Sequence, residues 1–510
     1  MPHSIDSLSF EASTAATIES LGQIVPELIV TCTVLAIVLV DLFFIRGKGK
    51  RQGPLEMVVL AGMGAALIAT WAGFAGEPRA VFGTMMVVDP FSSFFDAVFL
   101  LATVLFVFST MMSNEIAVAD RSEYYTLAVG SVLGMMLMAS STDMVSIFIS
   151  VEFVSLASYV MAGFVRGDRR SSEASLKYVL YGSVSSAVLL FGFSYLYGLT
   201  GTTSLIEANQ VLYASNPYPL ALLFALVLVI AGLGFKIACV PFHFWAPDVY
   251  EGAPTPVTAF FTVAPKAAGF ALLSRFLVTL LSNPSTSPGF WTFLGSLDWP
   301  LLVGILAAGT MTLGNFGALR QTNMKRLLAY SSIAHVGFVL MAVSTLSPEG
   351  LHAIIVYMAA YLVMNLGAFL VVIAIRERTG SVDLRDYDGL ANDAPMLVVA
   401  MVVFLYSLTG LPPSLGFLGK YYVFAETIRQ EIWWLAAIGA VNSVIALYYY
   451  FRVAKALVFR PLRERQWTGA IPELATSLSV ALAAVTLVFG VPWGAFEKVT
   501  TYSATLFLGR

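Results

Sequence analysis

Titratable side chains inside long apolar stretches are the residues of this sequence with the clearest capacity for chemistry. An ionised side chain near the centre of a bilayer costs about 2.5 to 3.5 kcal/mol on insertion scales, so it persists where it faces a polar interior and has a partner or a function. Seven of these residues stand out: Glu152, Lys177, Lys236, Lys266, Arg275, His335 and Lys420.

Glu152 and Lys236 are expected to form a proton switch. Burial lowers the proton affinity of a lysine and a nearby carboxylate raises it, so moving one partner switches the lysine between holding and releasing a proton. Lys177 is expected to compete for the same carboxylate. Two alternatives stay open here: Glu152 can be paired for structural reasons alone, and Lys177, only a few residues inside its stretch, can extend to the interface.

The remaining groups would extend this switch into a relay, with water bridging the gaps between helices. Lys266 lies near the middle of its stretch and would pass a proton along the membrane plane. His335 would relay the proton, although a local hydrogen bond to a neighbouring serine is an equal alternative. Lys420 would take the exit side. Arg275 lies toward the far end of its stretch and is expected to be a structural anchor.

The composition sets the environment for these groups. The chain has 510 residues, 58% of them hydrophobic and 12% charged, whereas soluble domains average about 25% charged residues. The net charge of −3 leaves no basic surplus for binding nucleic acid. Cys32 and Cys239 lie in apolar stretches, without the Cys or His neighbours that zinc, an iron–sulfur cluster or haem requires. We therefore expect a membrane protein without a cofactor or metal of its own.

Fourteen stretches are long and apolar enough to cross a bilayer, since a spanning helix needs about 20 such residues. The sequence therefore predicts an all-α integral membrane protein. The expected spans are residues 22–45, 55–75, 90–112, 123–141, 143–165, 174–199, 217–240, 254–282, 300–319, 325–346, 351–375, 395–428, 432–458 and 472–494.

The distribution of basic residues predicts the orientation, because positively charged loops stay in the cytoplasm. The loops after every odd-numbered span hold nineteen Lys and Arg residues, including the run between 46 and 51. The opposite loops and the two termini hold four. We therefore expect both termini on the periplasmic side of a cell's inner (plasma) membrane, with the protein crossing it many times.

Two of the expected spans are interrupted by glycine and proline close to a lysine and are predicted to be broken, because proline removes a hydrogen-bond donor and clashes with the preceding turn. The seventh runs from Gly232 through Lys236 to Pro241, and the twelfth runs through Pro412 and Pro413 to Lys420. Broken helices at membrane depth are tolerated where they face protein or a water-filled cavity, and in transporters they mark the ion pathway. His243, just past the first break, could gate proton exchange or belong to an aromatic belt at the interface.

The spacing of these features suggests an internal repeat. Lys236 and Lys420 are 184 residues apart, and Glu152 and His335 are 183 apart. Two copies of five helices, spans 4–8 and 9–13, would have opposite orientations, which is the inverted-repeat arrangement of many transporters. The expected organisation is N-terminal helices in 1–121, the first copy in 122–282, the second in 300–458 and a last helix in 459–510.

Three ordered motifs give the chain a specific resemblance. Residues 234–257 read GFKIACVPFHFWAPDVYEGAPTPV, residues 325–335 read KRLLAYSSIAH, and residues 408–413 read LTGLPP before Lys420. Together with Glu152 between Val151 and Phe153, they resemble the antiporter-like, proton-pumping subunits of respiratory complex I, the NADH:quinone oxidoreductase. The resemblance covers residues 20–495. Lys420 stands where the M branch of that family usually has glutamate, and the chain ends without the long lateral helix of the L branch, which leaves the third branch.

The resemblance implies a place in a larger assembly. It implies a Glu152 and Lys236 pair, a central Lys266, a terminal Lys420, and discontinuous seventh and twelfth helices. It also implies that flavin, iron–sulfur clusters, NADH oxidation and quinone reduction belong to other subunits, and that the partners are neighbouring membrane-arm subunits. The absence of a G-x-G-x-x-G phosphate cradle in this sequence agrees with that division.

Three functional hypotheses follow. The first is a non-redox, proton-translocating subunit of an energy-converting NADH:quinone oxidoreductase. The second is a subunit of a cation/proton antiporter that works without electron transfer, because that class shares the broken helices and buried lysines. The third is a membrane-spanning scaffold in which the ionisable residues have structural roles only.

Overall fold

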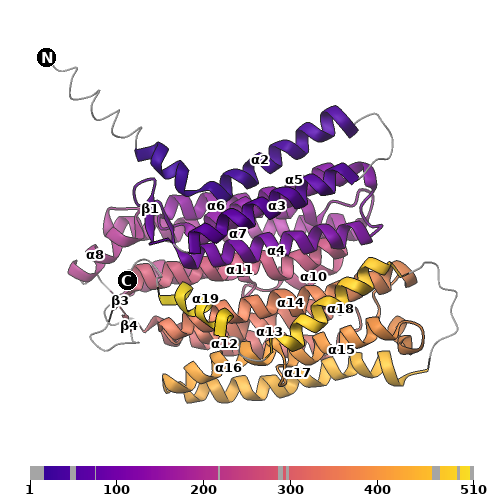
Figure 1. The fold of residues 1–510 in the computed structure, drawn as a ribbon. Coiled ribbons are helices and arrows are strands. Elements are labelled where there is room, and N and C mark those ends of the chain that lie inside the picture. The colour runs from indigo at the N-terminus through magenta and orange to yellow at the C-terminus, as the bar shows by residue number, and fades with distance from the viewer. Residues whose placement is uncertain are drawn as a thin grey trace.

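The computed structural model describes residues 16–45, 53–74, 76–215, 219–284, 291–293, 298–461, 471–490 and 494–505. Long helices lie side by side along one direction and form the whole body of the molecule (Figure 1). Among the described residues, eleven helices are long and apolar enough to cross a membrane. The expected all-α membrane fold is therefore confirmed.

The helices follow the order expected from the sequence. The first group contains α2 (Val25–Val40, extended by a π-helical turn to Ile45), α3 (Gly53–Phe74) and α4 (Pro90–Met112). The next contains α5 (Arg121–Ser140), α6 (Met144–Ala162), α7 (Arg169–Thr200), α9 (Pro219–Ile237), α10 (Trp245–Gly252) and α11 (Thr255–Leu281). The last comprises α12 (Trp299–Leu319), α13 (Met324–Val343), α14 (Pro348–Thr379), α15 (Pro395–Thr409), α16 (Leu415–Arg429), α17 (Trp433–Phe459), α18 (Glu473–Val488) and α19 (Gly494–Thr505).

Short elements occupy the connections. Two antiparallel hairpins pair β1 (Arg79–Val81) with β2 (Met86–Val88) and β3 (Ser282–Pro284) with β4 (Trp291–Phe293). The helix α8 (Leu205–Ser215) lies between α7 and α9, and one-turn 3-10 helices cover Val118–Asp120, Leu384–Tyr387 and Leu390–Asn392. The basic run at 46–51, which contributed to the predicted orientation, lies outside the described residues.

The expected number of fourteen spans stays a prediction. Eleven of the expected stretches coincide with the helices that meet the length and hydropathy of a span. The other three correspond to α5, to the pair α15 and α16, and to α18. Both α15 and α18 are apolar but have fewer than 18 residues. Interruption by Pro412 and Pro413 is the reason that the twelfth expected span forms two short helices.

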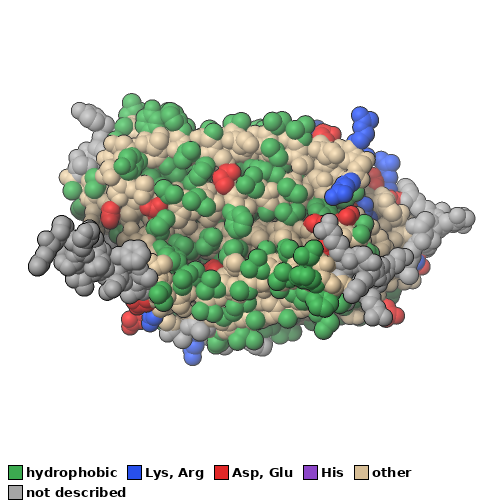
Figure 2. Space-filling model, turned by 90° about the horizontal axis from the view of Figure 1, so that it is seen from above, with side chains coloured by type: hydrophobic (Ala, Val, Ile, Leu, Met, Phe, Trp, Pro, Cys, Tyr) green, Lys and Arg blue, Asp and Glu red, His purple; other side chains and the backbone are tan. Residues whose placement is uncertain are grey.

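Three helices form the centre of the bundle. The apolar window of α11 is entirely buried, and those of α13 and α14 are 89% buried. In Figure 1, α11 lies between the N-terminal helices and the orange helices of the C-terminal half. By contrast, only 28% of the window of α7 is buried. Hydrophobic side chains are spread over the middle of the face in Figure 2, and Lys and Arg gather mostly toward one end, as expected for a surface in lipid or against other subunits.

Helix lengths agree with two copies of a five-helix unit. Both α7 and α14 have 32 residues, and both α11 and α17 have 27. The single offset of about 184 residues does not hold throughout, because the proline breaks at Pro241 and Pro413 are closer together in sequence than Lys236 and Lys420. Lys236 precedes its break and Lys420 follows its own. The domain boundaries themselves stay a prediction.

The hairpin of α12 and α13 shows how small residues bring helices together in this fold. A Cβ atom at Gly337 would lie 2.4 Å from the backbone nitrogen of Met311, and one at Gly314 would lie 2.5 Å from that of Ala334. Backbone atoms cannot move aside as a flexible side chain can. Close helix contact through small residues is the usual packing mode where lipid removes the hydrophobic driving force.

The Gly337→Ala substitution is expected to destabilise the chain by about 1 to 3 kcal/mol, because a methyl group would be forced against a neighbouring backbone. The matched control is Gly64→Ala in α3, where nothing lies within 4 Å of the added atom. Thermal denaturation of the purified assembly would measure both. Equal melting temperatures for the two variants would contradict the close-packing argument.

Candidate functional site

The first break in the bundle follows Lys236, which lies in the last turn of α9 and is 2% exposed. The backbone groups that the break releases are bound by side chains of other segments. Trp245 Nε1 donates to the carbonyl of Phe235 at 3.0 Å, and the amide of Val240 donates to Thr310 Oγ1 at 3.0 Å. The break is thus enclosed by protein, as backbone at membrane depth must be.

His243 lies inside this break rather than on a helix. It is 8% exposed, and its ring packs against that of Phe244 with centroids 4.5 Å apart. Its Nδ1 atom has no hydrogen-bond partner among the residues that the structure describes. Burial argues against the aromatic-belt alternative, and the gating role stays a hypothesis.

The second break places Lys420 against the end of the preceding half-helix. Lys420 Nζ donates to the carbonyl of Thr409, the last residue of α15, at 2.8 Å, and to Ser443 Oγ at 3.3 Å. Gly410 has a φ of 87°, and a Cβ atom there would lie 2.5 Å from Lys420 Cδ. Lys236 belongs to the last turn of α9, so both lysines lie at carbonyl ends of half-helices. The partial negative charge of a helix C-terminus stabilises an ammonium group at such a position.

Glu152 and Lys236 approach each other through serines. Lys236 Nζ donates to Ser155 Oγ of α6 at 3.0 Å. Ser155 lies three residues after Glu152, and side chains at that spacing are about 5–6 Å apart at Cβ on one helix face. Glu152 itself accepts a short hydrogen bond from Ser186 of α7. The expected pair is therefore one helical turn from direct contact.

Lys177 has different partners from the expected one. Its ammonium pairs with Asp248 at 2.6 Å and with Glu173 at 2.8 Å, and its side chain is 36% exposed. The structure does not bring Lys177 to Glu152. Its partial exposure fits the alternative of a lysine that reaches the interface.

Asp248 is the centre of this peripheral cluster. Besides Lys177, Arg326 Nη1 donates to it at 2.7 Å and also pairs with Glu251 at 2.9 Å. Burial by itself raises the pKa of Asp248, but hydrogen bonds from Lys177 and Arg326 outweigh it and hold the pKa below its usual value. The carboxylate is therefore ionised at neutral pH, and the cluster joins α7, α10 and α13.

Lys266 occupies the middle of the buried helix α11, directly after Pro265. Proline cannot donate to the carbonyl of Phe261 four residues earlier, and Tyr250 Oη donates to that carbonyl instead at 3.1 Å. Lys266 Nζ lies 5.6 Å from the centroid of the Tyr250 ring and donates to Ser332 Oγ of α13 at 2.7 Å.

Lys236 and Lys266 are linked through α11. The stem of Lys236 packs near Gly269, where an added Cβ atom would lie 3.7 Å from Lys236 Cγ. Gly269 is three residues after Lys266, so the two lysines approach one another within about one helical turn along α11. A larger residue at position 269 would push α9 away from this helix.

His335 is held by two tyrosines. Its Nδ1 atom is 2.7 Å from Tyr357 Oη, and its Nε2 atom is 3.1 Å from Tyr450 Oη. Tyr450 also makes a short hydrogen bond to Ser331. The partners of His335 are therefore two tyrosines of other helices and not a neighbouring serine. Both ring nitrogens of His335 have a partner that can donate or accept, which suits a proton relay.

The last step leads from His335 to Lys420. Phe338, one turn after His335 on α13, has its ring centroid 4.4 Å from Lys420 Nζ. Gly419, the residue before Lys420, packs on Tyr357. A Cβ atom added at Gly419 would lie 3.1 Å from Tyr357 Cδ2. The residues around His335 therefore touch those around Lys420.

These contacts join five predicted residues in one series, here termed the central row. Every step consists of a direct contact and one helical turn along α6, α11 or α13. Serine hydroxyls, which can accept and donate at once, occupy the intervening positions from Glu152 to Lys236 and from Lys266 to His335, whereas Gly269 and the Phe338 ring occupy those of the other two steps. The members are Glu152, Lys236, Lys266, His335 and Lys420.

Sequence reasoning did not find the neutral members of this site. Ser155 lies three residues after Glu152, and Ser332 lies three residues before His335. A hydroxyl one helical turn from a titratable residue in an apolar helix could have identified both serines from the sequence. Tyr357 and Tyr450 gave no such signal, because only packing brings their helices to α13.

The described residues offer no metal site. No group of three or more His, Cys, Asp or Glu side chains in that part of the chain lies close enough to hold an ion. Both cysteines are free thiols, Cys32 exposed and Cys239 buried. The chemistry that these side chains can perform is proton binding and transfer.

Similar proteins were found by sequence. The model of the family described as NADH:quinone oxidoreductase/Mrp antiporter, TM matches residues 141–446. The NADH-quinone oxidoreductase subunit N of Anaeromyxobacter sp. (strain Fw109-5) is 45% identical and covers 95% of this chain and 96% of its own. That of Chlorobium chlorochromatii (strain CaD3) is 43% identical, with 96% and 95% covered.

Solved structures show the same likeness. A chain of respiratory complex I from Thermus thermophilus is 32% identical, with a TM-score of 0.75 over 91% of this chain and 96% of that one. A chain of the Mrp complex from Dietzia sp. DQ12-45-1b has a TM-score of 0.80 at 22% identity, over 96% and 97%, and so shares the fold. Both sequence relatives belong to the subunit N branch, which is the branch expected when M and L are set aside. The chain therefore belongs to the NADH:quinone oxidoreductase/Mrp antiporter transmembrane family and, within it, to the subunit N branch.

Proposed function

We propose that this chain is a proton-translocating membrane-arm subunit of an NADH:quinone oxidoreductase. It would couple quinone reduction in other subunits to proton movement through the central row. The observation that carries this proposal is the continuity of that row, in which each titratable group is joined to the next by a hydroxyl, an aromatic ring or one helical turn.

Each member has a proposed role. Glu152 and Lys236 act as the switch, since a shift of one turn would bring the carboxylate to the ammonium and change its proton affinity. Lys266 passes the proton across the centre, His335 relays it between its two tyrosines, and Lys420 releases it.

Two further residues have proposed roles at the edges of the row. Lys177 binds and releases protons at the charged end, where it pairs with Asp248 and Glu173. His243 gates exchange at the first break, where its Nδ1 atom has no hydrogen-bond partner among the described residues.

The setting follows from the relatives and the charge distribution. The chain is a non-redox subunit, and flavin, iron–sulfur clusters and quinone belong to partner subunits of the membrane and peripheral arms. Both termini face the periplasm of a bacterial plasma membrane. Identities of 45% to subunit N and 22% to the Mrp chain favour the oxidoreductase over the antiporter hypothesis.

The test is Lys236→Ala in the intact complex. We expect the complex to assemble, and proton pumping and coupled quinone reduction to fall together, because a tightly coupled machine cannot turn over with one step blocked. Glu152→Ala should give the same paired loss. Lys455→Ala on the exposed face of α17 is the matched control.

The measurements are NADH-driven acidification of inside-out vesicles, quinone reduction, and the amount of complex in a native gel. Intact assembly with unchanged pumping in Lys236→Ala would support the scaffold hypothesis and refute the site.

A further inference from the structure

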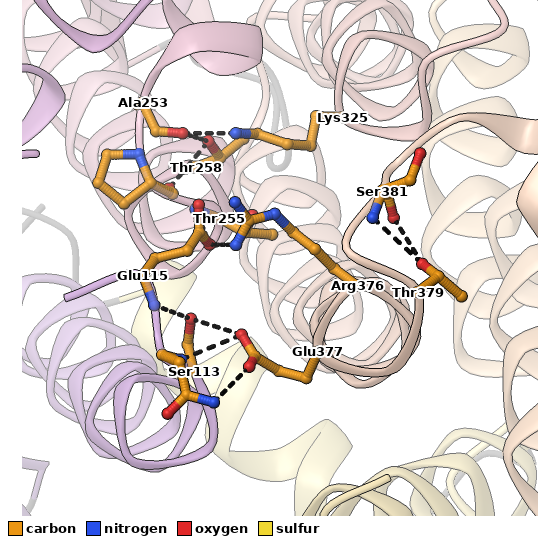
Figure 3. Close-up of polar contacts among 12 residues, drawn as sticks. Ser113, Glu115, Ala253, Thr255, Thr258, Lys325, Arg376, Glu377, Thr379 and Ser381 are labelled. Carbon is orange, nitrogen blue, oxygen red and sulfur yellow. Dashed lines mark hydrogen bonds and ion pairs between the residues drawn. The ribbon is translucent and has the colours of Figure 1, made fainter. Parts of the chain in front are cut away.

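Two kinds of polar contact join the helices of this chain. Near the helix ends the contacts involve charged side chains, as where Arg376 of α14 pairs with Glu115 at 2.9 Å and Glu377 faces the segment after α4 (Figure 3). Glu377 accepts there from the amide of Asn114 at 3.0 Å and from its Nδ2 atom at 2.7 Å. Neutral side chains make the second kind, which joins α12 to α17.

Four residues make this second contact, here termed the α12–α17 seam: Thr312, Asn315, Asn442 and Tyr449. Asn315 Nδ2 donates to Asn442 Oδ1 at 2.9 Å and to the carbonyl of the same residue at 3.0 Å. Tyr449 Oη donates to Asn315 Oδ1 at 3.0 Å, and Asn442 Nδ2 donates to Thr312 Oγ1 at 3.1 Å. Asn315 and Tyr449 are 0% exposed, so the middle of the seam is enclosed by protein.

The seam fixes the rotation of an outer helix. Only 39% of the apolar window of α17 is buried, against 89% for α13 and α14. Apolar contacts are not directional, so a helix with a small buried face needs polar contacts to set its rotation. Asn442 and Tyr449 are seven residues apart, which places them on one face two turns apart. Asn315 binds both and therefore ties two turns of α17 to one point of α12.

Tyr450, the next residue, connects this rotation to the central row. Tyr450 Oη lies 3.1 Å from His335 Nε2, and the Tyr450 ring packs on that of Tyr449 with centroids 4.4 Å apart. Consecutive side chains of a helix point about 100° apart, so fixing Tyr449 also fixes the direction in which Tyr450 leaves α17. Because hydrogen bonds weaken steeply with angle and distance, a small rotation of α17 would separate Tyr450 from His335.

The amides of the seam also isolate the central row. A hydroxyl accepts and donates at once, whereas an amide oxygen only accepts and an amide nitrogen only donates. Tyr449 therefore donates to Asn315, and Asn315 cannot pass a proton on to Asn442 as a hydroxyl would. The seam thus holds the relay in place without carrying protons away from it toward the outer face of α12 and α17.

We propose that Asn315 is a positioning residue of the proton relay. By binding Tyr449 it holds α17 in the rotation that keeps Tyr450 Oη against His335. The inference rests on the proposed function and deepens it, since it adds a residue that acts on the step through His335. Asn315 itself neither gains nor loses a proton.

The first test is Asn315→Leu in the intact complex, which keeps a similar shape and removes the polar atoms. We expect assembly to be retained, because interhelical hydrogen bonds contribute modestly to stability in membranes. Coupled quinone reduction per assembled complex should fall about 10- to 100-fold, as expected for a misplaced proton-transfer group. Its solvent isotope effect in D₂O should rise, because proton transfer becomes limiting, whereas a purely structural loss would leave the isotope effect unchanged.

Tyr449→Phe removes the same hydrogen bond from the other side and should reproduce both changes, so it decides the matter if Asn315→Leu fails to assemble. Thr312→Val is the matched control. It removes the outermost hydroxyl of the seam, while Asn442 Nδ2 still donates to the carbonyl of Ile438 at 3.0 Å, and it should behave as wild type. Wild-type rate and isotope effect in assembled Tyr449→Phe, or an equal loss in Thr312→Val, would overturn the inference.

The second test asks whether Asn315 acts through Tyr450. If it does, Tyr450→Phe already removes the contact that Asn315 maintains, and the double variant should be no slower than Tyr450→Phe alone. Residues that act independently give defects that multiply, and multiplied defects would overturn the positioning role. Normal coupled activity in Lys236→Ala would instead overturn the proposed function. Normal activity in Asn315→Leu beside a defective Lys236→Ala overturns only the present inference.

Discussion

The Lys266→Ala variant is expected to lower NADH-driven proton pumping about 100-fold, in line with the contribution of a positioned proton-transfer group. Lys266 lies in the middle of the central row, between Lys236 and His335, so the row is interrupted without it. Its ammonium donates to Ser332 at 2.7 Å and lies over the Tyr250 ring. Vesicle acidification with the complex content normalised by native gel gives the measurement.

Lys266→Arg separates proton transfer from a structural role. Arginine retains the positive charge and the ring contact but stays protonated at all working pH values. A relay therefore fails in this variant as it fails with alanine, whereas a structural cation would be restored. Recovery of pumping by Lys266→Arg would refute the role of Lys266 as a proton carrier.

The Arg275→Leu variant is expected to cost about 3 to 5 kcal/mol of stability, because it leaves a buried carboxylate without its partner. Arg275 is 0% exposed and binds both oxygens of Asp89 at 2.9 and 3.0 Å, and its Nε donates to Ala139 at 2.6 Å. It joins α11 to the start of α4 and the end of α5. Thermal denaturation and the yield of assembled complex would measure the loss.

The double variant Arg275→Leu with Asp89→Asn is the informative control. Removing both charges avoids the uncompensated carboxylate, and asparagine retains the ability to cap α4, which Asp89 caps through Ser92. The double variant should therefore be more stable than Arg275→Leu alone. Equal or greater loss in the double variant would mean that the ion pair itself, rather than the buried charge, carries the stability.

Much of this architecture was available from the sequence. Long apolar stretches predicted the membrane helices, and the prolines at 241, 412 and 413 predicted both breaks, because proline lacks the amide donor and its ring clashes with the preceding turn. Charged residues inside apolar stretches marked the central row. Arg275 was predicted to be an anchor from its position near a helix end, and its paired contact with Asp89 confirms that role.

The side chains that each charged residue binds could not be predicted from the sequence. Lys177 was expected to compete for Glu152, but it binds Asp248 and Glu173, and Glu152 binds Ser186. Which side chains meet depends on the rotation and tilt of neighbouring helices, and those follow from packing across the whole bundle. The offset of 184 residues likewise matched Lys236, which precedes its helix break, with Lys420, which follows its own. A distance counted in residues does not show where a helix ends.

The sequence by itself determined the environment, the family, the broken helices and the charged members of the central row, since hydropathy, proline and buried charge act locally along the chain. Only the tertiary structure decided the hydroxyls and tyrosines that lie along the central row and the cluster around Asp248. Contacts between helices that are far apart in sequence create those features, such as α6 with α9 in the row and α7 with α10 and α13 in the cluster. Neutral polar side chains cost little to place in an apolar helix, so their role becomes visible only where packing aligns them.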